Sequence, residues 1–261
     1  MSAEQLLREG RLSDALQQLK DQVRSDPSNP KHRIFLFQMM AVQGQWERAL
    51  TQLNVVADMD PAALAMAQMY RATLQCEVLR AEVFSGKRSP LVFGEPPPWI
   101  GALVEALRAT AEGKHDAAAG LRGAAFEAAS ATPGAVDGKA FAWIADADPR
   151  LGPVVEAIVD GRYFWIPVEN IRRIVIEEPA DLRDMVWMPA HFTWANEGET
   201  VGLIPTRYPE SEASEDDLIR LALKTEWIAV AEDVSLGLGQ RLLATDVDDY
   251  PLMDIREISL G

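Results

Sequence analysis

The chain has 261 residues, of which 48% are hydrophobic and 25% are charged, and its formal net charge is −15. This composition supplies enough apolar side chains for a sizeable core and argues against disorder as the main state. The acidic excess argues against a nucleic-acid partner, because phosphate binding draws its affinity from Lys and Arg. No apolar run approaches the ~20 residues that a membrane-spanning helix needs.

The cysteine content and the N-terminus bear on the compartment in which the protein works. The single cysteine, Cys76, permits no internal disulfide, which favours a reducing compartment. The first residues lack a cationic segment followed by an apolar stretch, so they do not resemble a secretory signal peptide. We therefore expect a cytoplasmic protein.

Charge divides the chain into two parts. Residues 1–139 hold 15 Lys and Arg against 16 Asp and Glu, whereas residues 140–261 hold 10 against 24. Five of the seven Trp also lie in the second part. Such a change of composition predicts two domains with different surfaces, at residues 1–139 and 140–261.

The first predicted domain contains a self-match at an offset of 34 residues. Gly10 matches Gly44, and Asp26-Pro27 matches Asp60-Pro61, with Ala-Leu pairs in register between them. This period, with Gly at a turn and Pro after the second helix, is the tetratricopeptide signature. Repeats of this kind stack into a solenoid with a concave groove. The groove either binds a peptide or serves only as a scaffold for the second domain.

Apolar spacing predicts the helices of this domain in chain order. The expected helices cover residues 13–25, 31–43 and 62–84. Gly and Pro then predict a loop at residues 85–99. An Ala-rich helix at 116–130 belongs to a degenerate later repeat and ends near a Pro-Gly pair.

After residue 140 the helical pattern gives way to short β-rich runs. We expect one helix that ends at Gly161, a hairpin around Asn196-Glu197-Gly198, and one short helix near the end of the chain. The predicted helices are 148–160 and 216–224, and the predicted strands are 162–166, 171–176, 185–194, 200–204, 240–245 and 253–259. The whole chain is therefore predicted to be α+β, with a tetratricopeptide-like all-α repeat region followed by a mixed, mostly antiparallel β-rich domain.

The sequence contains no pattern that points to a metal, a cofactor or a catalytic nucleophile. His32, His115 and His191 lie far apart, and a single Cys cannot form a thiolate cluster. Phosphate-binding loops and the nucleophile elbow are missing from the sequence. Cys76 lies inside a predicted helix, where a buried structural thiol is expected. We therefore expect a protein that is not an enzyme and has no cofactor.

One polar cluster supports an alternative hypothesis. Glu178, Asp181 and Asp184 flank Arg183, and carboxylates beside an Arg can serve as an acid/base site in a hydrolase. In the structural interpretation, Arg183 pairs with the neighbouring carboxylates and Asp181 caps a short helical turn. We favour the structural interpretation, because structural ion pairs greatly outnumber active sites. A self-associating scaffold is a further alternative.

Several runs in the second domain are distinctive, above all Asp160-Gly-Arg-Tyr-Phe-Trp-Ile-Pro167 and the run from Pro179 to Ala190. Further runs of this kind lie at residues 202–209, 224–227 and 239–241. Together these runs resemble the ImpE/SciE/TagJ family of type VI secretion accessory proteins. The similarity covers nearly the whole chain, since that family also begins with tetratricopeptide-like helices.

The resemblance implies a bacterial, non-catalytic adaptor. Members of the family bind the N-terminal helix of the small subunit of the contractile sheath. They are linked to the AAA+ ATPase that recycles the contracted sheath. The resemblance thus implies these two partners.

Candidate partner-binding residues come from the aromatic and arginine side chains of the second domain, because Trp, Tyr and Arg dominate binding hot spots. We predict that Arg207 and Tyr208, between two prolines, are exposed. The other candidates lie in or beside predicted strands, where core packing is the competing interpretation. The full set is Arg183, Trp187, Trp194, Arg207 and Tyr208.

Overall fold

The computed structural model describes residues 3–232 and 234–261, and the fold is α+β, as the sequence predicts. Most helices precede most strands along the chain. The α-helices of the described residues are α1 (Ala3–Arg8), α2 (Leu12–Ser25), α3 (Pro30–Val42), α4 (Trp46–Met59), α5 (Leu64–Phe84), α6 (Ile100–Ala111), α7 (His115–Ala128) and α8 (Asp217–Arg220). None of these helices is long and apolar enough to cross a membrane.

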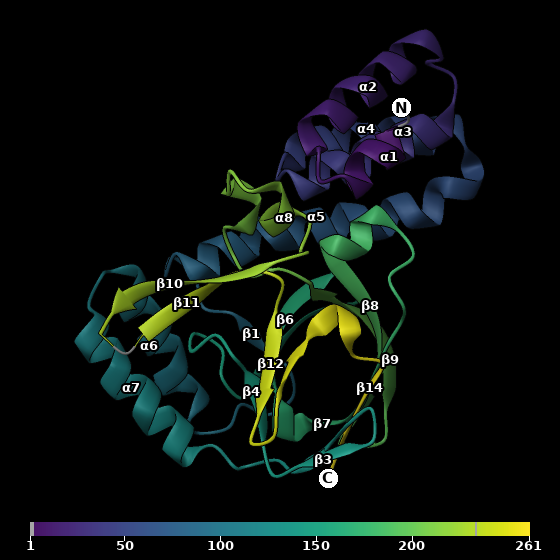
Figure 1. Cartoon of the computed structure of the whole chain (residues 1–261). Coiled ribbons are helices and arrows are strands. Elements are labelled where there is room, and N and C mark those ends of the chain that lie inside the picture. Colours follow the sequence, from purple (N-terminus) through teal and green to yellow (C-terminus); the bar gives the residue numbers. More distant parts are fainter. Residues whose placement is uncertain (1–2, 233) are drawn as a thin grey trace.

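The predicted N-terminal helices are confirmed at α2, α3, α5 and α7. Their ends have local causes. Gly10 and Gly44 adopt φ values of +71° and +66° in the turns between helices, a conformation that costs other residues free energy. Asn29 caps α3 by accepting a hydrogen bond from the N–H of Lys31, and Pro30 occupies the first turn. Helices α1 to α4 form a group at one end of the molecule, and α5 runs between that group and the sheet (Figure 1).

The second half of the chain builds a nine-stranded sheet with the order β1-β6-β5-β9-β8-β7-β14-β2-β3. β12 pairs with β13 and β4, and β10 pairs with β11, in two smaller sheets. The strands are β1 (Leu91–Val92), β2 (Gly134–Val136), β3 (Lys139–Phe141), β4 (Ile144–Asp146), β5 (Val154–Val159), β6 (Arg162–Pro167), β7 (Ile171–Ile176), β8 (Trp187–Trp194), β9 (Glu199–Pro205), β10 (Thr225–Ala231), β11 (Val234–Gly239), β12 (Leu242–Thr245), β13 (Asp249–Pro251) and β14 (Glu257–Leu260).

Pairing in the main sheet is largely antiparallel. The predicted hairpin is confirmed: β8 and β9 pair from Trp187 opposite Pro205 to Thr193 opposite Glu199, and Glu197 takes a positive φ of 65° in the turn. β1 pairs with β6 in parallel and lies within the predicted loop 85–99, so part of the first half of the chain contributes to the sheet.

One prediction in this half is wrong, one hairpin was missed, and one helix is shorter than predicted. Residues 148–160 do not form a helix, because they contain a turn followed by β5. Val154, Val155, Ile158 and Val159 are β-branched, and β5 is buried on both faces, so its continuous apolar run resembled a helix face. The β10–β11 hairpin was not predicted at all. The predicted helix 216–224 is shorter than expected, at Asp217–Arg220.

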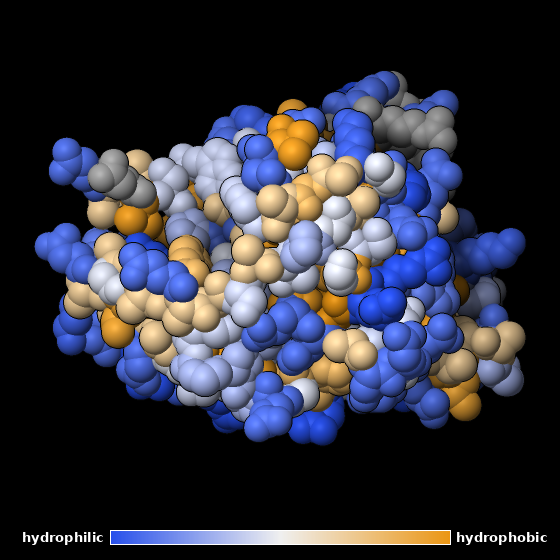
Figure 2. Space-filling view, turned by 90° about the horizontal axis from the view of Figure 1, so that it is seen from below, coloured by the Kyte–Doolittle hydropathy of each residue, from blue (hydrophilic) through white to orange (hydrophobic). Residues whose placement is uncertain are grey.

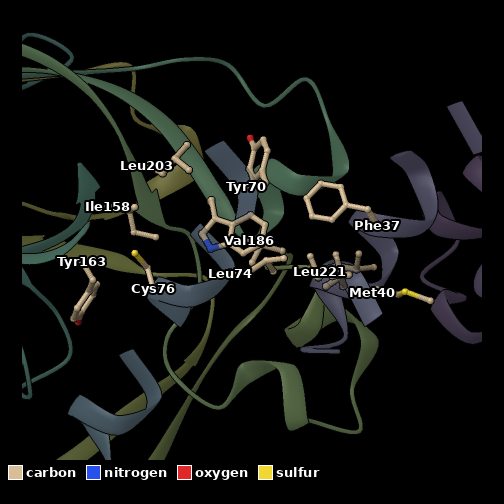
Figure 3. Close-up of a cluster of buried hydrophobic side chains, with 14 of the residues drawn as sticks. Phe37, Met40, Tyr70, Leu74, Cys76, Ile158, Tyr163, Val186, Leu203 and Leu221 are labelled. Atoms are coloured by element: carbon tan, nitrogen blue, oxygen red, sulfur yellow. The ribbon is translucent and has the colours of Figure 1, made fainter. Parts of the chain in front are cut away.

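One apolar core joins the helices to the sheet. Phe37 and Tyr70 from the helices pack in the same buried cluster as Ile158, Tyr163 and Leu203 from the strands. Figure 3 shows these side chains converging around α5. The predicted domain boundary at 139/140 therefore stays a prediction that rests on the change in composition. The apolar core is continuous across that boundary.

Candidate functional site

A network of buried charged side chains joins α5 to the sheet. Arg80 donates two hydrogen bonds to Glu156, at 2.8 and 3.1 Å. The Tyr163 hydroxyl donates to the same carboxylate at 2.5 Å, and Arg241 forms a further ion pair with it. Burial alone would raise the pKa of Glu156, but the two guanidinium groups outweigh it and lower the pKa to about 2. The buried charge is thus compensated, and the network fixes α5 against β5.

Arg207 and Tyr208 are buried, so their predicted exposure is wrong. Arg207 is 4% exposed and donates to the carbonyl oxygens of Val42, at 2.7 Å, and Arg220. These carbonyls lie at helix C-terminal ends, which leave acceptors unpaired and attract cations. Tyr208 is 0% exposed, and its hydroxyl donates to the carbonyl oxygen of Leu242 and accepts from its N–H. The proline-flanked stretch therefore ties α3 and α8 to the sheet.

The other candidate partner-binding residues also pack mainly inside. Trp187 is fully buried, and its indole N–H donates to Glu77 at 2.8 Å. Trp194 stacks on Phe192, with ring centroids 4.9 Å apart. Arg183 keeps 25% of its side chain exposed and places its guanidinium 5.0 Å from the centre of the Tyr70 ring. Partner binding through this set stays a prediction, with Arg183 the most accessible member.

The hydrolase hypothesis requires the side chains of the acidic cluster to converge on a pocket. In the structure these side chains do not converge. Asp181 and Asp184 form a capping box on the 3₁₀-helix Leu182–Met185, and Arg183 pairs with Asp181 at 3.1 Å. Burial raises the pKa of Asp184, whose carboxylate accepts two backbone N–H groups. Glu178 is exposed. In the described ranges, no three His, Cys, Asp or Glu side chains are grouped as metal ligands would be.

An open apolar pocket of about 430 Å³ lies between the end of α7 and β4. Its walls come from residues 129–132, β4 and the turn at 147–153. Phe126 and Trp143 line it and are 37% and 40% exposed, so each presents an aromatic surface to solvent. Gly152 has φ +54°, and a Cβ there would lie 2.3 Å from the ring of Phe126, so the glycine permits the ring's position.

Exposed acidic residues lie beside this pocket. Asp246 accepts a hydrogen bond from the N–H of Ala142 at 2.7 Å, which brings the exposed acidic turn 246–249 next to Trp143. Asp146 lines the pocket, but its carboxylate pairs with Arg241, and burial raises its pKa to about 6. Viewed from below the molecule, hydrophobic side chains form separate small groups among hydrophilic ones (Figure 2). The pocket with its acidic neighbour is therefore the candidate site.

The sequence analysis missed Phe126 and Trp143 as site residues. Phe126 follows Ala125 in α7, and a helical wheel built on the buried Ala118, Arg122 and Ala125 would have placed it beside the inner face. Trp143 lies between β3 and β4, where strand alternation is too short to reveal its direction. The sequence therefore offered one signal for these two site residues: both are aromatic residues that local patterns do not assign to the core.

Comparison with known proteins identifies the family. The family model described as "ImpE protein" matches residues 138–259. The type VI secretion system accessory component TagJ of Pseudomonas aeruginosa is 53% identical over 258 residues, covering 99% of this chain and 90% of that protein. The crystal structure of protein VPA1032 from Vibrio parahaemolyticus has the same fold, with a TM-score of 0.88 at 24% identity, over 99% of this chain and 97% of that one. The chain therefore belongs to the ImpE/TagJ family of type VI secretion system accessory proteins.

Proposed function

We propose that the protein is a non-catalytic adaptor that captures the N-terminal helix of the small sheath subunit of a type VI secretion system. Through that helix it serves the recycling of the contracted sheath by the AAA+ ATPase. Family membership supports the accessory role. The observation that carries the binding mode is the apolar pocket between α7 and β4, with Phe126 and Trp143 at its surface.

The pocket suits the apolar face of a helix. An amphipathic helix binds a groove through side chains at positions i, i+3, i+4 and i+7. The volume of about 430 Å³ lies in the usual range for binding pockets, about 300–1,000 Å³. Each fully buried aliphatic or aromatic anchor contributes about 1.5–3 kcal/mol. A few anchors are thus compatible with micromolar affinity, about −8 kcal/mol, once the cost of association is subtracted.

The acidic surroundings favour a helix that carries Lys or Arg beside its apolar anchors. The exposed turn 246–249 places three aspartates next to the pocket, and residues 140–261 carry the acidic excess of the chain. Exposed charge pairs of this kind steer association more than they strengthen it. Raising the salt concentration should therefore slow association and weaken binding only modestly.

Titration calorimetry with a synthetic peptide of the cognate sheath subunit's N-terminal helix tests the proposal. We expect saturable binding to the full chain, and a loss of affinity of at least about tenfold with Trp143→Ala, as for a truncated hot-spot aromatic. Trp227→Ala is the matched control, because Trp227 is 41% exposed, Trp143 is 40% exposed, and Trp227 lies outside the pocket. Absence of peptide binding would refute helix capture. Binding that is equally tight in both variants would refute this pocket as the site.

A further inference from the structure

A small charged cavity lies between the C-terminal half of α5 and the segment 209–212 that follows β9. Its volume is about 100 Å³. One buried water needs roughly 15 Å³, whereas small-molecule pockets usually measure about 300–1,000 Å³. The cavity therefore has room for the end of one side chain. It shares no residue with the pocket between α7 and β4.

Both buried and exposed charged side chains line this cavity. Glu77 and Arg80 of α5 are only 7% and 5% exposed. Glu210 is exposed and Glu212 is half-buried. Trp46, at the start of α4, adds a partly exposed aromatic wall. The cavity thus leads from an acidic mouth to a buried ion pair.

The buried ion pair keeps one acceptor and one donor free of hydrogen bonds. Oε1 of Glu77 accepts from the indole N–H of Trp187 at 2.8 Å. Oε2 of Glu77 lies 3.6 Å from Nη1 of Arg80, beyond hydrogen-bond distance, and between described residues neither atom forms a hydrogen bond. Burial raises the pKa of Glu77 more than Arg80 and Trp187 lower it, so its negative charge is incompletely compensated. Oε2 is therefore available to a donor that enters the cavity.

The two arginines that line the cavity already have their own carboxylates. Arg80 donates to Glu156 at 2.8 and 3.1 Å. Arg150 pairs with Asp148 at 2.6 Å, and both side chains are buried. Neither arginine is therefore free to neutralise the carboxylates at the mouth.

The carboxylates at the mouth have no close cationic partner. Among the described residues, neither Glu210 nor Glu212 forms an ion pair or a side-chain hydrogen bond. Arg207 attracts Glu212, but it does not line the cavity, and the carbonyls of Val42 and Arg220 hold its guanidinium group. With the directly bonded neighbours included, six carboxylates face four guanidinium groups: Glu77, Asp146, Asp148, Glu156, Glu210 and Glu212 against Arg80, Arg150, Arg207 and Arg241.

We propose that this cavity binds the guanidinium group of an arginine side chain that a protein partner presents. A guanidinium group has five N–H donors in a planar fork, so it can donate to Oε2 of Glu77 while it faces Glu210 and Glu212. Its flat face suits the indole wall of Trp46. A metal ion fits less well, because no three acidic side chains of the described ranges are grouped as its ligands would be.

The mouth of the cavity favours an arginine within a polypeptide over the free amino acid. The peptide groups on either side of such an arginine are neutral. Free arginine instead brings its own carboxylate to the mouth, where Glu210 and Glu212 repel it. The structure thus favours an exposed arginine of a partner, in addition to any apolar anchors bound elsewhere.

NMR titration of the full chain tests the proposal, with the indole N–H of Trp46 as the reporter and Nα-acetyl-arginine amide as the probe. We expect a saturable shift with a millimolar dissociation constant, as ligand efficiency allows for a molecule of this size. Nα-acetyl-citrulline amide has nearly the same shape without the charge and should bind at least about tenfold more weakly. The corresponding lysine amide and free arginine should also bind more weakly.

Each probe has an outcome that overturns part of the proposal. A shift that does not saturate, or citrulline binding as tight as arginine binding, overturns the site. Equal binding of the lysine amide overturns the preference for guanidinium. Tighter binding of free arginine overturns the assignment to a protein partner.

Glutamine variants separate this cavity from the general attraction of an acidic chain for cations. Glu212→Gln retains the aliphatic part that packs on Gly44 and should weaken probe binding about threefold, as for a partly exposed charge pair. The double variant Glu210→Gln/Glu212→Gln should weaken it further. Glu215→Gln is the matched control, because Glu215 is exposed in the same segment but lies outside the cavity, and binding should not change.

The amide spectrum of each variant verifies that it is folded. Equal losses in Glu212→Gln and Glu215→Gln would show general charge attraction only and would overturn the site. Failure of the helix peptide to bind in calorimetry leaves these results unaffected, because the two sites share no residue. The two proposals therefore fail independently.

Discussion

Replacing Glu156 with glutamine removes the one negative charge that faces both Arg80 and Arg241. Glu156 is 0% exposed and the two arginines are 5% and 2% exposed, so water cannot replace the lost carboxylate. Glutamine is nearly isosteric, so the effect reports the charge rather than a cavity. We expect a large loss of stability and looser docking of α5 on the sheet.

Two arguments give the expected loss of unfolding free energy in Glu156→Gln. A pKa of about 2 for Glu156, against the ordinary 4.5, corresponds to about 3 kcal/mol of folding free energy at about 1.4 kcal/mol per pKa unit. Removing one member of a buried ion pair costs about 3–5 kcal/mol, because the remaining charge stays buried. Because the folded-state pKa is lowered, the contribution is complete above pH ~4.5 and is lost as the pH falls toward 2.

Urea denaturation of the two proteins at pH 7 and at pH 3 measures the effect. Glu156→Gln should lower the unfolding free energy by about 3–5 kcal/mol at pH 7, and the difference between the proteins should shrink at pH 3. Glu82→Gln is the control, since its ion pair with Arg88 has the same chemistry but is 39% and 64% exposed, and it should cost less than about 1 kcal/mol. A loss below about 1 kcal/mol for Glu156→Gln, or a difference independent of pH, would refute the reasoning.

Two further predictions concern the pocket and the thiol. Gly152→Ala should cost about 1–2 kcal/mol in a thermal melt, because its φ is +54° and its Cβ would displace the ring of Phe126, and it should also weaken binding of the helix peptide. An unchanged melting temperature would contradict that steric account. Cys76 is 4% exposed and burial raises its pKa to about 11, so alkylation at pH 8 should be slower by at least about 100-fold in the folded protein than in urea. Comparable rates would show that the thiol is accessible.

Local patterns predicted α2, α3, α5 and α7, because each of these helices carries its own signals. Gly10 and Gly44 marked turns through the backbone freedom they supply, and the apolar spacing marked the helices that follow. The β8–β9 hairpin was predictable for the same reason, since its turn residues lie within a few positions of one another. The wrong helix at 148–160 shows the limit, because a strand buried on both faces has no alternation to distinguish it.

The candidate site could not be predicted in the same way. Phe126 and Trp143 come from a helix and from the connection between two short strands, and only their approach across the fold creates the pocket. The prediction for Arg207 and Tyr208 was wrong in the opposite sense, because they were expected to be exposed and are buried. Their polar character and flanking prolines suggested a surface turn, whereas distant partners such as Val42 and Leu242 satisfy their hydrogen bonds in the interior. Whether a polar residue is buried depends on partners that its neighbours in sequence do not reveal.

The sequence by itself determined the class of the fold, the repeated helices, the acidic second half and the resemblance to a secretion accessory family, since composition, periodicity and motifs are local properties of the chain. The tertiary structure alone decided which aromatic residues reach solvent and that Glu156 meets Arg80 and Arg241. These features depend on which elements pack against one another, and they arise from contacts between residues far apart in the sequence, such as the 76 positions that separate Arg80 from Glu156.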